Sequence, residues 1–189
     1  MTEFSNLFKS GDALLIIDVQ KDFCPGGALP VEGGDQIVPV INRWIAEAMA
    51  NDVPVYASRD WHPLGHLSFK ERGGPWPPHC IQDSDGARFH QDLALPSSTI
   101  IVTKGVRFDQ DQNSAFEQTG LAVQLRKASI RRLWVAGLAE DVCVLATVLD
   151  ACREGFEAIL IQNATQPITS EGGKKARRQM QDAGARIVV

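Results

Sequence analysis

The stretch that decides the fold is RRLWVAGLAEDVCVLATVLDA, residues 131–151. Its apolar run Arg132–Gly137 predicts a buried strand, and the pattern that follows predicts a helix over Val142–Glu154. On that helix one apolar stripe should face the core, formed by Leu145, Val148, Leu149 and Cys152. Cys143 therefore stands at a strand-to-helix corner, where the helix dipole and free N–H groups favour a thiolate.

The same alternation of short apolar strands and amphipathic helices runs along the whole chain. Strands are predicted at Ala13–Asp18, Pro54–Arg59, Thr99–Lys104, Arg132–Gly137, Ala158–Ile161 and Arg186–Val189. The other predicted helices are Asp35–Ala50, Leu121–Ala128 and Gly172–Ala183. Six strands joined by crossover helices predict an α/β protein with a parallel sheet covered on both faces, a three-layer α/β/α sandwich.

Length and composition narrow the class of protein. The 189 residues suit one domain, which we expect to span 1–189. A net charge of -4 and a pI near 5.5 argue against a nucleic-acid partner. The apolar runs are strand-sized and the N-terminus has no secretory pattern, so we expect no membrane segment and no secretory signal. Four cysteines without Cys-x-x-Cys spacing fit a reducing cytoplasm.

Three reactive side chains stand where predicted strands end. Asp18 closes the run ALLIID, Lys104 closes TIIVTK, and Cys143 follows the strand of the opening stretch. In an open parallel sheet, ligands bind at the carboxyl ends of the strands, so these groups predict thiol chemistry supported by a carboxylate and an ammonium. Taken singly, Cys143 could be a small buried hydrophobe and Asp18 could merely cap a turn.

Two long segments interrupt the alternation, Val19–Gly34 and Asp60–Pro96, and both follow strands. Loops of this length inside a domain are usually functional, so we expect both at the catalytic edge of the sheet. The second holds a group of potential metal ligands: Asp60, His62, His66 and His79. Imidazole and carboxylate together suit zinc, iron or manganese. The alternative is histidines on a polar surface, and which three side chains bind stays open.

The remaining features of the sequence do not point to another ligand. His90 is isolated from the other histidines, and we interpret it as a non-ligand. No Gly-x-Gly-x-x-Gly follows the first predicted strand, so a dinucleotide site is unsupported.

Taken jointly, five motifs resemble the nicotinamidase branch of the isochorismatase-like cysteine hydrolases. They are IIDVQKDFCPGGALPV (16–31), SRDWHPLGHLSF (58–69), GGPWPPHCIQ (73–82), TKG followed by NSAF (103–116), and GLAEDVCVLATVLDA (137–151). The resemblance runs from about Ala13 to Val189. It implies a six-stranded parallel sheet in the order 3-2-1-4-5-6.

The resemblance also implies a role for individual residues. Asp18, Lys104 and Cys143 match the catalytic triad, and Asp60, His62 and His79 match the metal ligands. His66 matches a further ligand or a group that supports the ligands. Phe23 and Trp76 match aromatic walls of the substrate pocket. Ala139 and Cys143 match the oxyanion hole, beside a cis peptide at Leu138–Ala139.

The chain departs from the family pattern at two positions. Family members commonly have tyrosine where Asn113 stands, which would alter the pocket wall. They commonly have threonine where Glu140 stands, which would add charge near the nucleophile. Substrate identity is therefore less firmly implied than reaction class.

The implied function is hydrolysis of nicotinamide to nicotinate and ammonia through a cysteine thioester, in NAD salvage, with one divalent transition metal. Zinc is the first expectation, with iron or manganese as alternatives, and a homo-oligomer stays open. The main alternative is a related metal-containing amidohydrolase acting on another small carboxamide. An isochorismatase proper would not need the Asp60, His62 and His79 set. A binding module without catalysis conflicts with the intact triad, and a thiol redox protein conflicts with the missing Cys-x-x-Cys.

Overall fold

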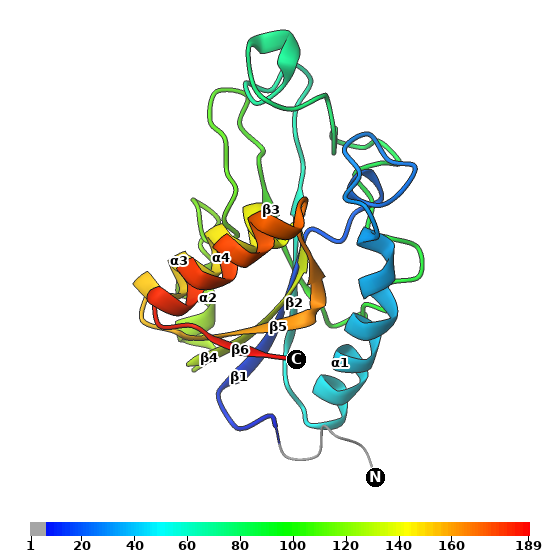
Figure 1. The fold of residues 1–189 in the computed structure, drawn as a ribbon. Helices are drawn as coiled ribbons and strands as arrows, with labels where there is room; N and C mark the ends of the chain where they lie inside the picture. Colours follow the sequence, from blue (N-terminus) through cyan, green and yellow to red (C-terminus); the bar gives the residue numbers. More distant parts are fainter. Residues whose placement is uncertain (1–6) are drawn as a thin grey trace.

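Six strands form one sheet in the order β3-β2-β1-β4-β5-β6, and every pairing is parallel. The computed structural model describes residues 7–189 (Figure 1). The strands are β1 (Asp12–Ile17), β2 (Val55–Asp60), β3 (Ile100–Lys104), β4 (Arg132–Leu138), β5 (Glu157–Gln166) and β6 (Arg186–Val188). The predicted fold class and strand order are confirmed.

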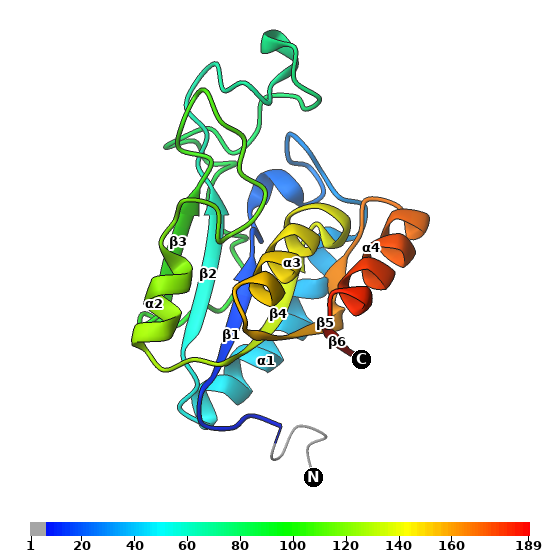
Figure 2. The same ribbon diagram turned by 90° about the vertical axis from the view of Figure 1, so that its left-hand side faces the viewer.

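Helices cover both faces of the sheet, because the central strands are apolar on both faces. Helix α1 (Val38–Ala50), entered through a 3-10 turn at Gly34–Ile37, lies on one face. The opposite face carries α2 (Leu121–Lys127), α3 (Leu145–Arg153) and α4 (Ser170–Asp182) (Figures 1 and 2). On β1 the side chains alternate between two cores, with Leu14 and Ile16 facing α1 and Leu15 and Ile17 facing α3.

The segment between β2 and β3 contains no α-helix and runs as a long excursion. Part of it packs under the α1 face, where Cys80, Ala87 and Leu93 are buried in the same core as α1. The rest rises beyond the carboxyl ends of the strands, beside the loop that follows β1 (Figure 2). Both long loops therefore lie at the predicted edge of the sheet.

Two predicted elements differ from the structure in informative ways. Strand β5 extends past Ile161 to Gln166. The sequence pattern missed this extension because a bulge interrupts the regular pairing with β4 and breaks the period-two alternation. Past the bulge, Thr165 pairs with Gly137 and Gln166 with Leu138. Helix α3 starts at Leu145, because Glu140–Val144 forms a short π-helical turn.

The buried face of α3 is offset by one residue from the predicted stripe. Its buried side chains, with the last residue of the π-helical turn, are Val144, Thr147, Val148 and Ala151. Leu145, Leu149 and Cys152 are only partly buried, but Leu145 and Cys152 still pack against this core, so the predicted stripe is correct in part. Thr147 is tolerated inside because its Oγ1 accepts the Ala115 N–H at 3.0 Å.

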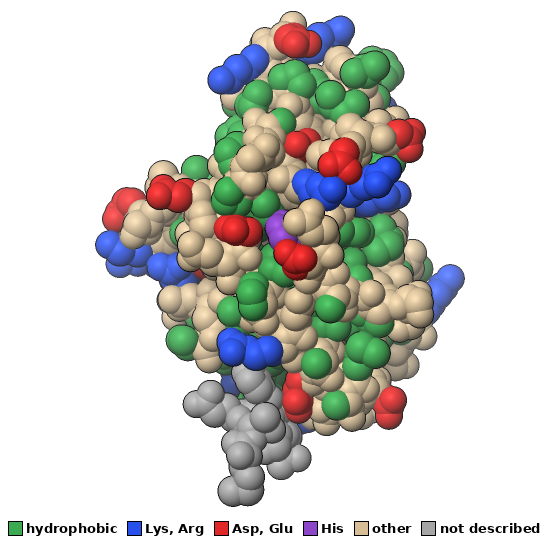
Figure 3. Space-filling view, turned by 90° about the vertical axis from the view of Figure 1, so that its right-hand side faces the viewer, with side chains coloured by type: hydrophobic (Ala, Val, Ile, Leu, Met, Phe, Trp, Pro, Cys, Tyr) green, Lys and Arg blue, Asp and Glu red, His purple; other side chains and the backbone are tan. Residues whose placement is uncertain are grey.

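Charged groups are mixed on the surface. Figure 3 shows the face that carries α1, where acidic and basic side chains are interspersed with apolar ones and no broad basic area appears. Within residues 7–189, no helix has the length and apolar character needed to cross a bilayer.

The offset of α3 gives a test of the packing. We expect Val148→Ala to lower the free energy of unfolding by about 2 kcal/mol, because it removes two buried methyl groups and leaves a cavity. Cys152→Ala, at the partly exposed edge of that core, should cost less than about 1 kcal/mol. Urea unfolding of both variants measures the difference. Equal losses would contradict the buried face described here.

Candidate active site

A fully buried lysine lies at the centre of the site. The Lys104 ammonium at the end of β3 is 2.8 Å from Asp18 Oδ2 and 2.5 Å from Asp60 Oδ1. Its Nζ also lies 3.6 Å from the Sγ atom of Cys143. The structure therefore brings together the three residues that the strand ends predicted, and it adds Asp60 to the group.

Strand register explains this meeting. Asp60 and Lys104 are directly paired across β2 and β3, so their side chains lie side by side. Asp18 follows β1, the next strand along, with a left-handed backbone conformation (φ 46°). The Lys104 side chain reaches across β2 to meet it. Ser58 on β2 donates to Asp18 Oδ1 at 2.7 Å and holds the carboxylate in place.

Burial and mutual charge set the protonation of the group. Burial disfavours the ammonium, but Asp18 and Asp60 outweigh it and hold the pKa of Lys104 well above its usual value. Burial raises the pKa of Asp18, against the opposing effect of Lys104. Burial also raises the pKa of Cys143 well above that of a free thiol, although Lys104 opposes this. Burial of Cys143 therefore opposes the helix end, which was expected to favour a thiolate.

The turn that carries Cys143 follows β4 directly. A cis peptide joins Leu138 to Ala139, as the resemblance implied. The Ala139 carbonyl then accepts the N–H groups of Val142 and Val144, both at 3.1 Å. We call residues 139–144 the nucleophile turn. It places Cys143 in the wall of a cleft while 93% of its surface stays covered.

Three buried side chains could hold a metal ion beside this group. Ligand atoms of Asp60, His62 and His79 lie within 4.8 Å of one another. The Nδ1 atom of His62 faces the His79 carbonyl at 3.2 Å, and that of His79 faces the Pro77 carbonyl at 2.8 Å. A carbonyl only accepts, so each Nδ1 carries the proton and leaves Nε2 with its lone pair in the neutral ring.

The surroundings of His62 fit a metal ligand. Burial lowers the pKa of His62 to about 3, with His79 and His66 adding to the effect, so the ring is neutral. Gly105 leaves space beside its Nε2, because a Cβ there would lie only 2.7 Å from that atom. Neutral imidazoles with a carboxylate form a donor set that suits zinc and related metals.

His66 is arranged differently from these three residues. Its Nδ1 lies 2.7 Å from Ser68 Oγ, and its Nε2 lies 3.0 Å from the Gln110 carbonyl. The ring packs against His62 with centroids 4.3 Å apart. Both nitrogens are engaged, which favours the supporting role over direct ligation. Asp111 approaches His62 and His66 from the pocket wall.

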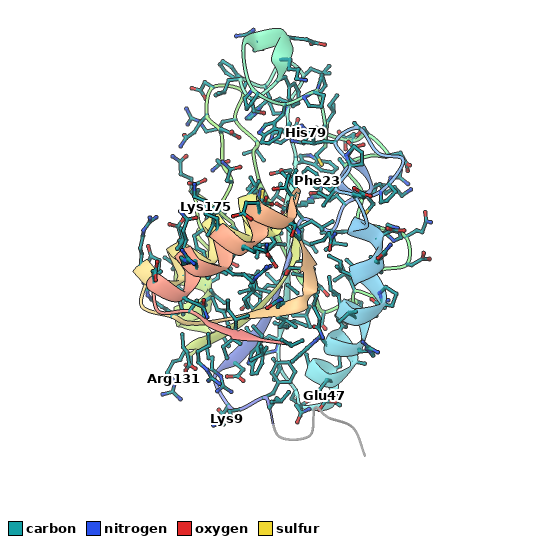
Figure 4. All side chains as sticks on the ribbon, in the orientation of Figure 1. Lys9, Phe23, Glu47, His79, Arg131 and Lys175 are labelled. Carbon is teal, nitrogen blue, oxygen red and sulfur yellow. The ribbon has the colours of Figure 1, made fainter. Side chains whose placement is uncertain are left out.

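A cleft of about 610 Å³, counted to its open mouth, lies above these groups. The predicted residues that line it are Phe23, Asp60, His62, Trp76, His79, Asn113, Ala139 and Cys143. Phe23 and His79 sit together above the sheet, 5.5 Å between centroids, whereas Lys9 and Arg131 mark the opposite end of the strands (Figure 4).

Several residues of the site were not assigned from the sequence. Leu29, Pro30, Val31, Val142 and Ile168 add apolar wall, consistent with a flat ring as ligand. The loop around Leu29 to Val31 was expected near the site, but Ile168 lies just past β5 and carried no signal.

Gln20 is another unassigned residue, although it lies in a quoted motif. It is fully buried and clamps the Asp60 backbone, accepting its N–H at 2.7 Å and donating to its carbonyl at 2.8 Å.

Glu140 does not act as expected. It is buried, but it faces Thr165 and Arg177 instead of the cleft. Its charge is countered by Arg177, so it adds no free charge to the pocket, which corrects the expectation from its position in sequence.

Known proteins resemble the chain over nearly its full length. A family model described as Isochorismatase domain matches residues 12–188. The nicotinamidase of Escherichia coli K12 is 36% identical, with 93% of each chain covered. The pyrazinamidase of Pyrococcus horikoshii, solved in complex with zinc, is 43% identical with a TM-score of 0.92, covering 94% of this chain and 98% of that one.

A second solved structure, PnC1 from L. infantum in complex with nicotinate, is 37% identical with a TM-score of 0.87 and covers 94% of this chain and 91% of its own. The family match, the strand order and the arrangement of the strand-end residues agree. The chain belongs to the isochorismatase family.

Proposed function

We propose that this protein is a nicotinamidase, which hydrolyses nicotinamide to nicotinate and ammonia through a Cys143 thioester and serves NAD salvage. The observation that carries the proposal is the position of the Cys143 thiol. It lies against a buried ammonium at the base of an apolar cleft, next to a set of metal-type donors. The nicotinamidase and pyrazinamidase relatives support the substrate class.

The first half of the reaction needs a proton acceptor, because burial raises the pKa of the Cys143 thiol and the attacking sulfur must lose its proton. Asp18 takes the Cys143 proton as sulfur attacks the carboxamide carbon, and Lys104 remains an ammonium that stabilises the charged site. The carbonyl oxygen gains negative charge and is held by the N–H groups of Ala139 and Cys143. A donor of this kind is worth about 3 kcal/mol. Asp18 then gives its proton to the nitrogen, and ammonia leaves.

The second half of the reaction removes the acyl group. Water attacks the thioester carbon while Asp18 accepts one of its protons, the carbon–sulfur bond breaks, and the proton returns to the Cys143 sulfur. Nicotinate leaves and the resting thiol is restored. One carboxylate therefore serves both steps, which fits its position against the Lys104 ammonium.

We propose that Asp60, His62 and His79 hold one divalent metal, with zinc first and iron or manganese as alternatives. Bound there, the metal supplies a Lewis-acidic partner for the pyridine nitrogen of the substrate. Phe23 and Trp76 pack against the ring, and together these contacts orient the carboxamide towards Cys143. His66 supports the His62 ring without joining the ligand set.

The four cysteines are free thiols, which supports a reducing, cytoplasmic location. We further propose one hydrolase domain for the chain, supported by the family match over 12–188.

The first prediction tests the function itself. We expect ammonia release from nicotinamide and pyrazinamide but not from aliphatic amides, since these lack a ring for the apolar cleft. Cys143→Ala should abolish release, because no other group in the cleft is a thiol. The matched control is Cys152→Ala, which removes a thiol from the same helix region and should keep full activity.

Two outcomes of this assay would contradict the proposal. Substantial ammonia release by a folded Cys143→Ala protein would exclude the covalent mechanism. Activity on aliphatic amides alone would exclude nicotinamide as the substrate, and equal turnover of both classes would mean that the cleft does not select a ring and would favour a broader amidohydrolase.

The second prediction concerns metal content. His79→Ala should lose the bound metal after dialysis, whereas the wild type retains one ion per chain. His66→Ala should retain a metal with affinity weakened about 10- to 100-fold, as is typical for residues that support ligands. His90→Ala is the matched control and should match the wild type. The metal content per chain is measured by elemental mass spectrometry. Equal metal content in His79→Ala and in the wild type would remove His79 from the ligand set.

The third prediction concerns the pocket wall at Asn113. A tyrosine there would add aromatic area and replace an amide that both donates and accepts. We expect Asn113→Tyr to narrow the range of ring-substituted carboxamides while keeping activity on nicotinamide. The measurement is kcat/KM for nicotinamide and for a ring-substituted analogue in both proteins. If their ratio does not change, Asn113 has no part in substrate selection.

A further inference from the structure

A buried carboxylate that the reaction does not use lies directly beside the oxyanion corner. Glu140 follows Ala139 in the chain and is 1% exposed. Its Oε2 accepts the Thr165 hydroxyl at 2.5 Å, and its Oε1 accepts from the Arg177 guanidinium. Neither Glu140 nor Arg177 is among the residues that line the cleft. The pair therefore touches the back of the nucleophile turn and not the substrate.

Helix α4 is shaped to receive this carboxylate. A Cβ at Gly173 would lie 2.8 Å from Glu140 Oε1, so glycine is needed for the close approach. The preceding Gly172 does the same for Asp141, where a Cβ would lie 2.2 Å from Oδ2. Two successive acidic residues of the turn thus dock on the first turn of α4, at the positive end of its dipole.

The contact between the nucleophile turn and α4 also extends to the pocket wall. Asp141 Oδ1 accepts the Ile168 N–H at 2.9 Å, and the Ile168 side chain lines the cleft with Cys143. The bulge in β5 brings Thr165 opposite Gly137, which places its hydroxyl within reach of Glu140. The nucleophile turn is thus fixed from behind by β5 and α4.

We propose that Glu140 and Arg177 form a positioning pair, which holds the nucleophile turn so that the N–H groups of Ala139 and Cys143 meet the developing oxyanion. The pair deepens the proposed function and rests on it. The Glu140 side chain is 1% exposed and that of Arg177 is 23% exposed, so separating the charges would leave the Glu140 carboxylate buried without its cation. The pair anchors the turn one residue from Ala139 and three residues from Cys143. Loss of the pair should therefore displace both N–H groups.

A pair that only joined α4 to the sheet would contribute to the free energy of unfolding and leave the chemical step unchanged. Kinetic measurements separate these two roles.

The test uses the whole protein with its metal in place and three variants of the pair. Arg177→Met removes the cation and leaves the Glu140 carboxylate without its partner, whereas Arg177→Lys keeps the positive charge. The double variant, Glu140→Gln with Arg177→Met, removes both charges. The matched control is Arg186→Met, which breaks an ion pair with Glu157, 3.2 Å apart, at the opposite end of β5. Thermal unfolding confirms that each variant is folded at the assay temperature.

Two inhibitors separate the oxyanion corner from the rest of the cleft. Pyridine-3-carbaldehyde reports on the corner. Its carbonyl carbon bonds to the Cys143 sulfur, the thiol proton passes to the carbonyl oxygen by way of Asp18, and that oxygen comes to lie in the oxyanion hole. 3-Methylpyridine has the ring and no carbonyl, so its inhibition constant reports ring binding alone.

We expect Arg177→Met to lower kcat on nicotinamide by about 10- to 100-fold, the size of effect that a small misplacement of reacting groups causes. The inhibition constant of the aldehyde should rise by a similar factor, while that of 3-methylpyridine stays within about twofold. Arg177→Lys should recover most of the activity. The double variant should be no worse than Arg177→Met, because both substitutions disrupt one unit. Arg186→Met should match the wild type.

Two results would overturn the positioning role. One is a folded Arg177→Met protein with kcat within twofold of the wild type. The other is an equal loss of affinity for both inhibitors, which would mean that the pair shapes the cleft as a whole. The proposed function fails separately, when the wild type releases no ammonia from nicotinamide. In that case the same variants are compared on whichever amide the wild type does hydrolyse.

Discussion

The site depends on one ammonium group that is fully buried. Transferring the Lys104 charge into the protein interior is costly, and the cost is offset only because Asp18 and Asp60 lie within 3 Å of it. The dependence is mutual, since two neighbouring carboxylates without Lys104 would repel each other and one would be protonated. The cation therefore ties the ends of β1, β2 and β3 into one rigid unit. Because Asp60 also belongs to the metal-type donor set, Lys104 links the nucleophile to the group proposed to orient the ring.

Much of this arrangement could be predicted from the sequence, and the reason is topological. Residues at the carboxyl ends of parallel strands meet at one edge, so finding the strands was enough to place Asp18, Lys104 and Cys143 near one another. The direct contact of Lys104 with Asp60 required the register of β2 against β3, which no apolar pattern contains. The order of the strands came from the family resemblance.

The failed expectations have local causes. Helix α3 is apolar on two neighbouring stripes, and the choice between them depended on Thr147, whose polar side chain is satisfied by a backbone N–H from a distant segment. Glu140 was expected to charge the pocket because sequence distance to Cys143 is short. The π-helical turn directs it to the opposite side, where Arg177, 37 residues later in the chain, neutralises it. Such long-range partners cannot be read from one sequence.

The burial of Cys143 has a consequence for the chemical stability of the enzyme. Peroxides and alkylating agents attack thiolates that they can reach, whereas burial raises the pKa of this thiol and leaves only 7% of the residue exposed, at the cleft wall. Its reactivity appears when an amide enters the cleft and Asp18 accepts the proton. The sulfur is therefore a weak nucleophile in the free enzyme and becomes a strong one only during turnover.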